Sequence, residues 1–550
     1  MKTLFKLFVV SLIAASALVG CSSTPKVELG AVINMFESED IPSLDPSNAT
    51  DTVSFNSLGN VMEGLVMQGP VAGEMVAGVA ESWSFDEASL TWTFKLNPEA
   101  KWVNSAGEEQ RAVTAGDFVY SWDRVTTGDT FQYAFMITDV AKIVSYEAVD
   151  DTTLTVTLSE NVPYFLNVMA FATTYPIPAE AVEAAGEAFG TTAESMWYNG
   201  PFYMSEWTHG SQFIWTKNEA YWDAAVVRTP AVTWRVIEGY EPATGIELYD
   251  AGEIDRVGLS GEFVTQRKDD ADAVLVPDTA VFYLMFNMQN AGITDGAPKM
   301  DVTAGNPLFD NAKIRQAIAL QIEKSYITDQ ILKNGSVPAY SFVPGSYLSY
   351  EGVAFESVRG DGYLLTDKDQ AKTLFAEGMT ELGYSAGDNK LTVEILNYES
   401  ATAGLIIEYV KQELDTLFAD YGITVTVTTL PFADKLTKTE EGTYEISFSG
   451  WGPDYDWPTT YLDMWLANNA YNEIGYNNPE YDALVSPAGK TVAEAFADLQ
   501  TAEGVLLNDA AIVPIYQRAG ISLQNPAVHD VYYFLSGYDS AFKWAYKDVE

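Results

Sequence analysis

The chain of 550 residues contains one cysteine, Cys21. No disulfide can therefore form within the chain, and the rest of it lacks a thiolate metal cluster or a cysteine nucleophile. The fold must instead be held by a hydrophobic core. At about 100 to 200 residues per domain, the length suffices for about three domains. A composition of 47% hydrophobic and 13% aromatic residues is typical of a globular chain.

The cysteine stands at the end of a short apolar run. Lys2 and Lys6 precede this run, which extends from Leu7 to Val19 and is followed by Gly20 and Cys21. The pattern predicts a secretory signal peptide. The run is shorter than the roughly 20 residues that a helix needs to cross a bilayer, which argues against a permanent span.

The four residues that end at Cys21 resemble the bacterial lipobox. The resemblance implies cleavage before the cysteine and attachment of diacylglycerol to its sulfur. We predict that residues 1–20 form the signal peptide and that residues 21–28 form a lipidated N-terminus and tether. The protein is then expected on the extracellular face of the cell membrane, or on the periplasmic side where the cell has an outer membrane, because acylation at more than one chain anchors stably.

The formal net charge of -47 is the most unusual part of the composition. A polyanion of this size repels phosphates and anionic lipid head groups. Nucleic acid is therefore excluded as a partner, and we expect contact with the membrane only through the lipid anchor. The acidity itself is typical of a solvated extracellular surface and does not identify a ligand.

Signals of catalysis are weak throughout the chain. His209 and His529 are the only histidines, which disfavours zinc and nickel sites and a Ser-His-Asp triad. With 77 acidic residues, a pair of carboxylates of the kind used in glycoside hydrolysis is uninformative. The GxSxG, HExxH, Walker A and dinucleotide-binding motifs are absent. We predict that the protein is not an enzyme and uses no cofactor or metal.

Apolar residues recur at the spacings of both strands and helices. The segments from Leu90 to Leu96, Leu154 to Leu158 and Ile423 to Val427 alternate as half-buried strands do. Strand and helix signals alternate without long linkers, so we expect an α/β (mixed α+β) fold.

Two helices have recognisable ends. An apolar stripe from Ile314 to Ile322 follows Asp310, which can serve as the N-cap. A second stripe from Leu405 to Leu417 precedes Gly422, a plausible stop for that helix.

Short motifs recur in a fixed order along nearly the whole chain. They include Gly78 to Trp83, Thr114 to Trp122, Asn199 to Phe202, Ala251 to Asp255, Gly450 to Tyr455 and Ile512 to Tyr516. Each is weak by itself. Together and in this order they resemble the oligopeptide-binding proteins of ABC importers, a family of large three-domain extracellular solute-binding proteins.

The resemblance implies a two-lobed periplasmic-binding-protein-like fold that closes by a hinge and carries an extra smaller domain. Closure of such lobes on a ligand is a population shift toward the closed form. The expected division is domain I in three parts, 29–62, 197–279 and 518–550, domain II at 63–196, and domain III, the opposing lobe, at 280–517.

The resemblance also implies a function. Such a protein captures short peptides between its lobes and delivers them to the permeases and ATPases of an importer. A binder of varied peptides must recognise the shared backbone, ammonium and carboxylate, and strand-like hydrogen bonds suit the backbone. We expect the protein to act as a monomer.

Family positions carried over to this chain define a candidate site. Asp454 matches the carboxylate that pairs with the peptide ammonium. The loop around Thr50 and Thr52 and the segment at Gly450 match main-chain contacts, while aromatic side chains offer large apolar area to the ligand. The candidate ligand-binding residues are Asp454, Trp451, Gly450, Gly452, Phe432, Tyr133, Thr50 and Thr52.

Some of these residues have other interpretations. Taken alone, Trp451 and Phe432 are more often core residues than ligand contacts. Asp454 with Asp456 also fits a turn beside Pro453 or part of a calcium loop, since Asp-rich turns do both. These alternatives remain open from the sequence.

The carboxylate end of the ligand has no clear partner. Phe448, Thr439 and Ala403 stand where better-known relatives carry basic residues, and Lys438 and Lys333 lie only next to aligned positions. Three explanations remain open: longer peptides whose C-terminus reaches solvent, a nearby lysine used instead, or a ligand without a free carboxylate.

Other binding functions also remain open. Oligosaccharide binding is the main alternative, because aromatic faces stack on sugar rings and the chain has 13 tryptophans. A surface adhesin or peptide-signal receptor that works without transport is a second alternative. Nickel binding is disfavoured by the two histidines.

Overall fold

The computed structural model describes residues 30–549 apart from several internal gaps. The predicted signal peptide and the predicted lipidation site at Cys21 lie outside the described residues. The gaps are 72–73, 129–130, 238–240, 289–305, 345–347, 351–352, 356–364, 388, 470, 488 and 535.

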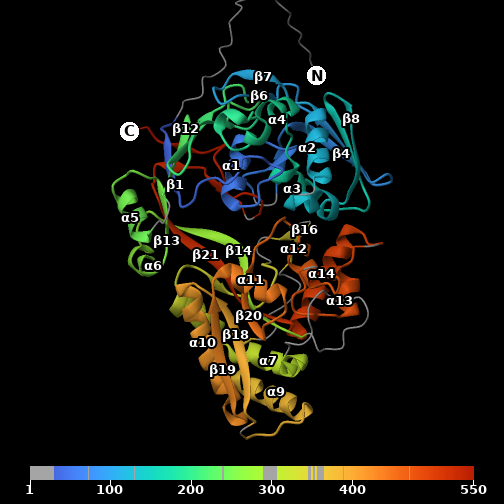
Figure 1. Ribbon diagram of the computed structural model, residues 1–550, viewed down its shortest axis with the longest axis vertical. Helices are drawn as coiled ribbons and strands as arrows, with labels where there is room; N and C mark the ends of the chain where they lie inside the picture. The colour runs from blue at the N-terminus through green and yellow to red at the C-terminus, as the bar shows by residue number, and fades with distance from the viewer. Residues whose placement is uncertain are drawn as a thin grey trace, which may run out of the picture.

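The molecule has an upper part, formed by the first half of the chain and the C-terminal segment, and a lower part formed mainly by residues from 300 onward (Figure 1). Two four-stranded sheets build the upper part. The first has the order β1 (Ile33–Glu37), β12 (Ala231–Val236), β11 (Gln212–Lys217), β10 (Phe202–Thr208). The second has the order β4 (Ala80–Asp86), β5 (Thr91–Leu96), β9 (Thr153–Leu158), β8 (Ile143–Asp150), and α2 (Ala115–Thr127) packs on β8.

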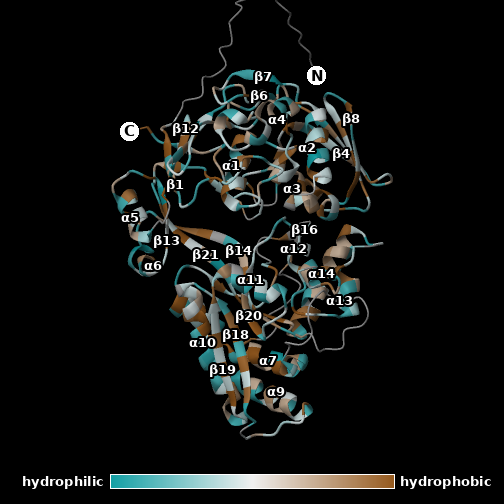
Figure 2. Ribbon diagram, in the orientation of Figure 1, coloured by the Kyte–Doolittle hydropathy of each residue, from teal (hydrophilic) through white to brown (hydrophobic). Residues whose placement is uncertain are grey.

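A seven-stranded mixed sheet forms the centre of the lower part. Parallel pairs join β18 to β19 and to β20, whereas the remaining pairs are antiparallel. Figure 2 shows hydrophobic residues along its long strands β14 and β21. The order is β13 (Arg256–Leu259), β21 (Ile512–Gln524), β14 (Ala273–Phe286), β20 (Ile446–Trp451), β18 (Leu391–Tyr398), β19 (Ile423–Leu430), with β15 (Val337–Pro338) beside β21.

The long strands β14 and β21 connect the two parts (Figure 1). They pair from Ala273 opposite Leu523 to Met285 opposite Ile512, with register shifts after Pro277 and after Phe282. The predicted boundaries at 279/280 and 517/518 fall within these strands, close to the first shift. Irregularities of this kind bend a strand locally, so we predict that β14 and β21 are the hinge strands between the lobes. The division into domains also stays a prediction.

The three predicted strands are present as β5, β9 and β19. The second predicted helix is α10 (Ala401–Phe418), followed by a short 3-10 turn and by Gly422 in the left-handed conformation, with φ 61° and ψ 37°. Leu405 was wrongly placed in the apolar stripe, because its side chain is 63% exposed. The apolar stripe predicted for this helix is therefore wider than the helix face that is buried in the structure.

The N-cap predicted at Asp310 is wrong by one residue. Helix α7 (Ala312–Gln321) begins after Asn311, whose side chain accepts a hydrogen bond from the Lys313 amide. Asp310 ends the preceding 3-10 turn (Pro307–Asp310). Asp and Asn both cap helices well. Because the 3-10 turn includes Asp310, the N-cap position falls on Asn311.

One large cluster of buried side chains extends through both lobes. In the part of the chain that the structure describes, no helix combines the length and the apolar character needed to cross a membrane.

Candidate functional site

A cavity of about 510 Å³ lies between the upper and lower lobes. This volume is in the range of about 300 to 1,000 Å³ that ligand pockets occupy. Five of the predicted site residues contribute to the lining, together with residues from the hinge strands and the C-terminal segment. The lining includes Thr50, Asp51, Thr52, Phe55, Tyr133, Phe171, Arg256, Asp278, Ala280, Gly452, Asp454, Arg518, Tyr533, Tyr538 and Asp539.

The upper wall is built on the start of helix α1 (Thr52–Val61). Asp51 is its N-cap and accepts hydrogen bonds from the amide (2.8 Å) and the hydroxyl (2.7 Å) of Ser54. This carboxylate is therefore used to hold the helix end. The cap leaves Thr50 and Thr52 exposed on the cavity wall.

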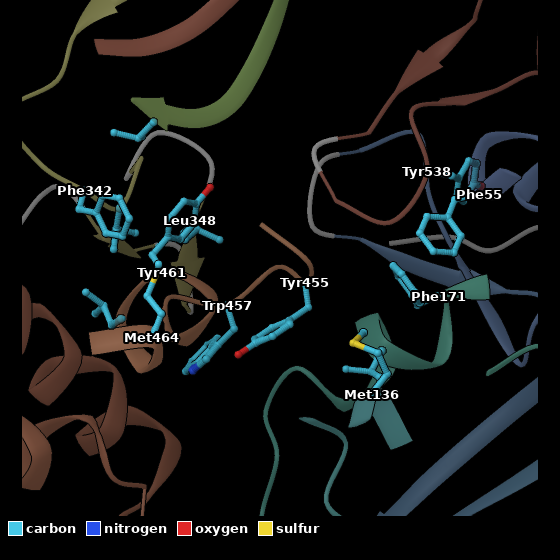
Figure 3. Close-up of a cluster of buried hydrophobic side chains, with 14 of the residues drawn as sticks. Phe55, Met136, Phe171, Phe342, Leu348, Tyr455, Trp457, Tyr461, Met464 and Tyr538 are labelled. Carbon is cyan, nitrogen blue, oxygen red and sulfur yellow. The ribbon is translucent and has the colours of Figure 1, made fainter. Parts of the chain in front are cut away.

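Aromatic rings form part of the cavity lining on the side of the upper lobe. The ring of Phe55 lies 5.3 Å from that of Tyr133 and 4.9 Å from that of Phe171. Figure 3 shows Phe55, Phe171 and Tyr538 gathered on the upper-lobe side, opposite Tyr455 on the other lobe. These faces offer apolar contact with little demand on the shape of a ligand.

Asp454 reaches the cavity from the loop after β20. Its backbone amide donates to the Thr460 hydroxyl (3.0 Å). Its carboxylate forms no hydrogen bond or ion pair with any residue that the structure describes. Burial raises the pKa of Asp454 to about 6, and it raises that of Tyr133 to about 12, with the charge of Asp454 as the second cause. The two side chains, one from each lobe, thus face each other across the cavity.

Two arginines bring positive charge to the cavity. Arg518 of β21 donates through Nε to the Asp278 carboxylate (2.5 Å), so its charge is paired. Arg256 has no such partner among the described residues. The carboxyl of Asp539 opens to the cavity, and desolvation raises its pKa, with Asp278 adding to the rise.

The structure brings Thr50, Thr52, Tyr133, Gly452 and Asp454 together around one cavity, although they come from distant parts of the chain. Gly452 faces open space. A Cβ built on it would meet only the Cβ of Ala280, at 3.9 Å. The main chain at this point is therefore accessible from the cavity.

Gly450, Trp451 and Phe432 lie outside the cavity lining. A Cβ on Gly450 would fall 2.8 Å from the Phe282 ring, so packing requires glycine there. The Trp451 indole donates to the Thr460 carbonyl (2.7 Å). Phe432 begins helix α11 (Phe432–Glu440) and is 57% exposed. A role for these three in ligand binding stays a prediction.

The alternative interpretations of the Asp454 loop find little support in the contacts. The loop is held by Thr460 through the Asp454 amide, whereas the Asp454 carboxylate takes no part in the turn. Within the described residues, no group of three or more His, Cys, Asp or Glu side chains is arranged to hold a metal ion.

The three positions that lack a basic residue are buried in the lower lobe. Phe448 packs between Phe282 and Tyr398, with ring centres at 5.8 and 6.2 Å. Thr439 donates to a backbone carbonyl and Ala403 lies in α10.

The neighbouring lysines have other contacts in this structure. Lys438 pairs with Glu394 (3.4 Å), and Lys333 caps a helical turn in the left-handed conformation. Neither lysine lines the cavity.

Sequence reasoning missed several residues of the lining. Phe55, Phe171 and Tyr538 are buried aromatics whose pattern resembles that of any core residue. Arg256 and Asp539 are nearly 300 positions apart, and nothing in the local sequence indicates that they share a cavity. Only the lone basic charge at 256, directly after a family motif, offered a signal.

The chain belongs to the bacterial extracellular solute-binding proteins of family 5. The model of this family, described as "family 5 Middle", matches residues 74–473. The resemblance drawn from the motifs is thereby confirmed, and the family consists of binding proteins rather than enzymes.

Individual relatives agree with this assignment. The dipeptide-binding protein DppE of Bacillus subtilis is 28% identical over 525 residues, which cover 92% of this chain and 90% of that protein. The substrate-binding domain of an oligopeptide ABC transporter from Bacillus anthracis is 33% identical, covers 94% of this chain and 99% of its own, and superposes with a TM-score of 0.72. Listeria monocytogenes OppA bound to peptide is 31% identical at the same coverage, with a TM-score of 0.73. The predicted mixed α/β binding-protein fold is confirmed.

Proposed function

We propose that this protein is the extracellular component of an ABC importer that captures short peptides between its two lobes. The observation that carries the proposal is the half-buried carboxylate of Asp454, which faces a cavity between the lobes and has no partner among the described residues. It offers one negative charge at a fixed place.

A peptide ammonium suits this carboxylate. Either charge buried alone costs several kcal/mol, and a close pair with good geometry offsets that cost. The accessible main chain at Gly452 and the loop at Thr50 and Thr52 supply groups for backbone hydrogen bonds, and the rings of Phe55 and Tyr133 suit varied side chains. Gly450, Trp451 and Phe432 join the site in this proposal when the lobes close further.

The relatives support the same ligand class. One is a dipeptide-binding protein and another was solved with a bound peptide. In this chain the hinge strands β14 and β21 carry both lobes, so a ligand that contacts both lobes favours the closed form. The cognate permeases and ATPases receive the peptide from that form.

Calorimetry with defined peptides tests the proposal. Oligoalanines of three to five residues serve as probes, each with a free or an acetylated N-terminus. We expect acetylation to weaken binding about hundredfold or more, because the neutral amide leaves Asp454 unpaired. Equal affinity for both forms would refute the ammonium site. If no oligoalanine binds but an oligosaccharide does, the protein is a sugar binder.

We further propose that lipid on Cys21 anchors the protein outside the cell. Two acyl chains on one cysteine give stable attachment. Cys21→Ala should move the protein from the membrane fraction into the medium or periplasm. A variant that still sediments with membranes in high salt would show that another element anchors it.

A further inference from the structure

Arg256 is a cavity residue that the proposed peptide site has not used. It is the first residue of β13 and pairs with Gln524 of β21, at the hinge side of the cavity. The guanidinium carbon lies 4.0 Å from the centre of the Tyr533 ring. Stacking on an aromatic face fixes the plane of a guanidinium and leaves its edge open.

This guanidinium has no partner within the described part of the chain. It forms no ion pair and no hydrogen bond there, and its Nε atom is buried without an acceptor. The carboxylate of the adjacent Asp255 is engaged by other partners. Asp255 is buried and already accepts from Asn34, Asn525 and Lys547.

The other charges of the cavity do not pair with Arg256. Asp278 is bound to Arg518 (2.5 Å), and Asp51 is occupied as a helix cap. Asp539 shares the cavity but is not within ion-pair distance. Desolvation lowers the pKa of Arg256, while Tyr533 and Asp539 act in the opposite direction, and an arginine remains charged in such surroundings. Among the described residues of the cavity, Arg256 is thus a cation that lacks an acceptor.

We propose that Arg256, held on Tyr533, is the subsite that binds a carboxylate of the ligand. The inference rests on the proposed peptide function and adds a second charged contact to it. Because Nε is buried, the two Nη atoms are the donors that face the ligand, and they match the two oxygens of a carboxylate. The carboxylate belongs either to the peptide C-terminus or to an Asp or Glu side chain.

This assignment explains the departures in the lower lobe. Phe448, Thr439 and Ala403 are buried and uncharged, so that lobe supplies no cation at these positions. Arg256 supplies the charge instead, from the edge strand β13 of the large sheet. With the ammonium at Asp454 and the carboxylate at Arg256, the direction of the peptide across the cavity is defined.

The test measures binding of four probe types by calorimetry. They are oligoalanines of three to five residues as free acids, the same peptides as C-terminal amides, and amidated peptides that contain one Glu or one Gln. The wild-type protein should bind at least one carboxylate form about tenfold or more tightly than its neutral counterpart. A preference for the free acid identifies the C-terminus, and a preference for Glu over Gln identifies a side chain.

Arg256→Met keeps the apolar stem on Tyr533 but removes the charge, so the preference should disappear in this variant. The matched control is Arg235→Met, which removes the same charge from an exposed pair with Glu253 outside the cavity. The control should keep the preference. Arg256→Lys should retain part of it, and it serves as the readout if the methionine variant does not fold.

Two outcomes overturn the inference alone. The first is equal binding of charged and neutral probes by the wild type. The second is a preference in Arg256→Met as large as that of the wild type or, where this variant does not fold, a preference in Arg256→Lys as large as that of the wild type. Absence of binding to every peptide would instead refute the proposed function, and the carboxylate subsite with it.

Discussion

Glu63 in the upper lobe and Asp454 at the cavity are both carboxyl groups whose pKa is raised by burial. Glu63 is 2% exposed and is held inside the chain. The Tyr221 hydroxyl donates to one of its oxygens, the Trp222 indole donates to the other (2.8 Å), and the charge of Lys543 lies nearby. Asp454 has no corresponding donor among the described residues.

The difference separates a carboxyl group that the fold satisfies from one that we propose binds the ligand. Both groups lose hydration on folding, which disfavours their charged forms. The upper lobe offsets this cost for Glu63 with its own donors. For Asp454 we propose that the ligand supplies the offset, so that the affinity of the protein depends on this carboxylate.

The largest expected effect is on ligand affinity at Asp454. Asp454→Ala should weaken peptide binding by about 3 kcal/mol or more, because a buried ammonium then lacks its partner. Stability should not fall, since the raised pKa shows that the charged carboxylate is unfavourable in the folded protein without ligand.

Asp456→Ala is the matched control for this variant. Asp456 lies in the same loop and its pKa is also raised to about 6 by burial, but it does not line the cavity. Its loss should leave affinity nearly unchanged. Equal losses in the two variants, measured by calorimetry, would show that the loop as a whole matters rather than the Asp454 charge.

The reverse pattern is expected at Glu63. Glu63→Gln places an amide group against two donors, Tyr221 and Trp222, and leaves one of them unsatisfied. Such a group costs about 1 to 3 kcal/mol of stability, whereas affinity for peptide should persist. Urea unfolding measures the loss, and Glu253→Gln at an exposed ion pair provides the control. A selective loss of peptide binding in Glu63→Gln would erase the distinction between the two carboxylates.

The pH dependence of binding sharpens the comparison further. Burial raises the pKa of Asp454 from its ordinary value of 3.8 to about 6, and this side chain pairs with an ammonium only when ionised. Affinity should therefore fall as pH drops below about 6, by about tenfold per pH unit. Burial also raises the pKa of Asp456 to about 6 and that of Asp463 to about 7, so these two groups titrate in the same pH range.

Calorimetry between about pH 4.5 and 8 with wild type and Asp454→Asn separates these contributions. The Asn variant should bind weakly with a much flatter profile. An unchanged profile in that variant would assign the titration to Asp456 or Asp463 instead.

The smallest effect is expected at a contact between the lobes. Tyr164 of the upper lobe stacks on Tyr455 of the lower lobe, with ring centres 4.5 Å apart. Figure 3 shows Tyr455 between Trp457 and the side that carries Met136. Tyr164→Ala should destabilise the closed form and weaken binding by about 1 kcal/mol.

The control is Tyr326→Ala, which removes a similar stack, on Tyr409 at 4.6 Å, inside one lobe. Small-angle scattering should show a more open average shape for the Tyr164 variant alone. Identical affinity and shape in both variants would mean that the stack does not contribute to closure.

Much of the fold was predictable because its signals are local. Alternation predicted β5, β9 and β19, and the apolar stripe with Gly422 predicted α10 and its end. The prediction at Asp310 was wrong because a 3-10 turn precedes the helix. The prediction at Leu405 was wrong because tertiary packing, and not the apolar pattern, decides which side of a helix is buried.

The site was predictable only in part. Family motifs led to Asp454, Gly452, Tyr133 and the loop at Thr50, all of which line the cavity. The predicted Phe432 is instead exposed at the start of helix α11, and its contact with a ligand stays a prediction.

The sequence by itself determined the class of protein and the absence of a disulfide framework, and it led to the prediction that Asp454 pairs with an ammonium. These follow from residue identity and from motifs in order along the chain. Only the tertiary structure decided which charges are satisfied. Arg518 and Asp278 neutralise each other, whereas Arg256 and Asp454 remain open, because pairing depends on distances of a few ångströms that β14, β21 and β13 impose on residues far apart in sequence.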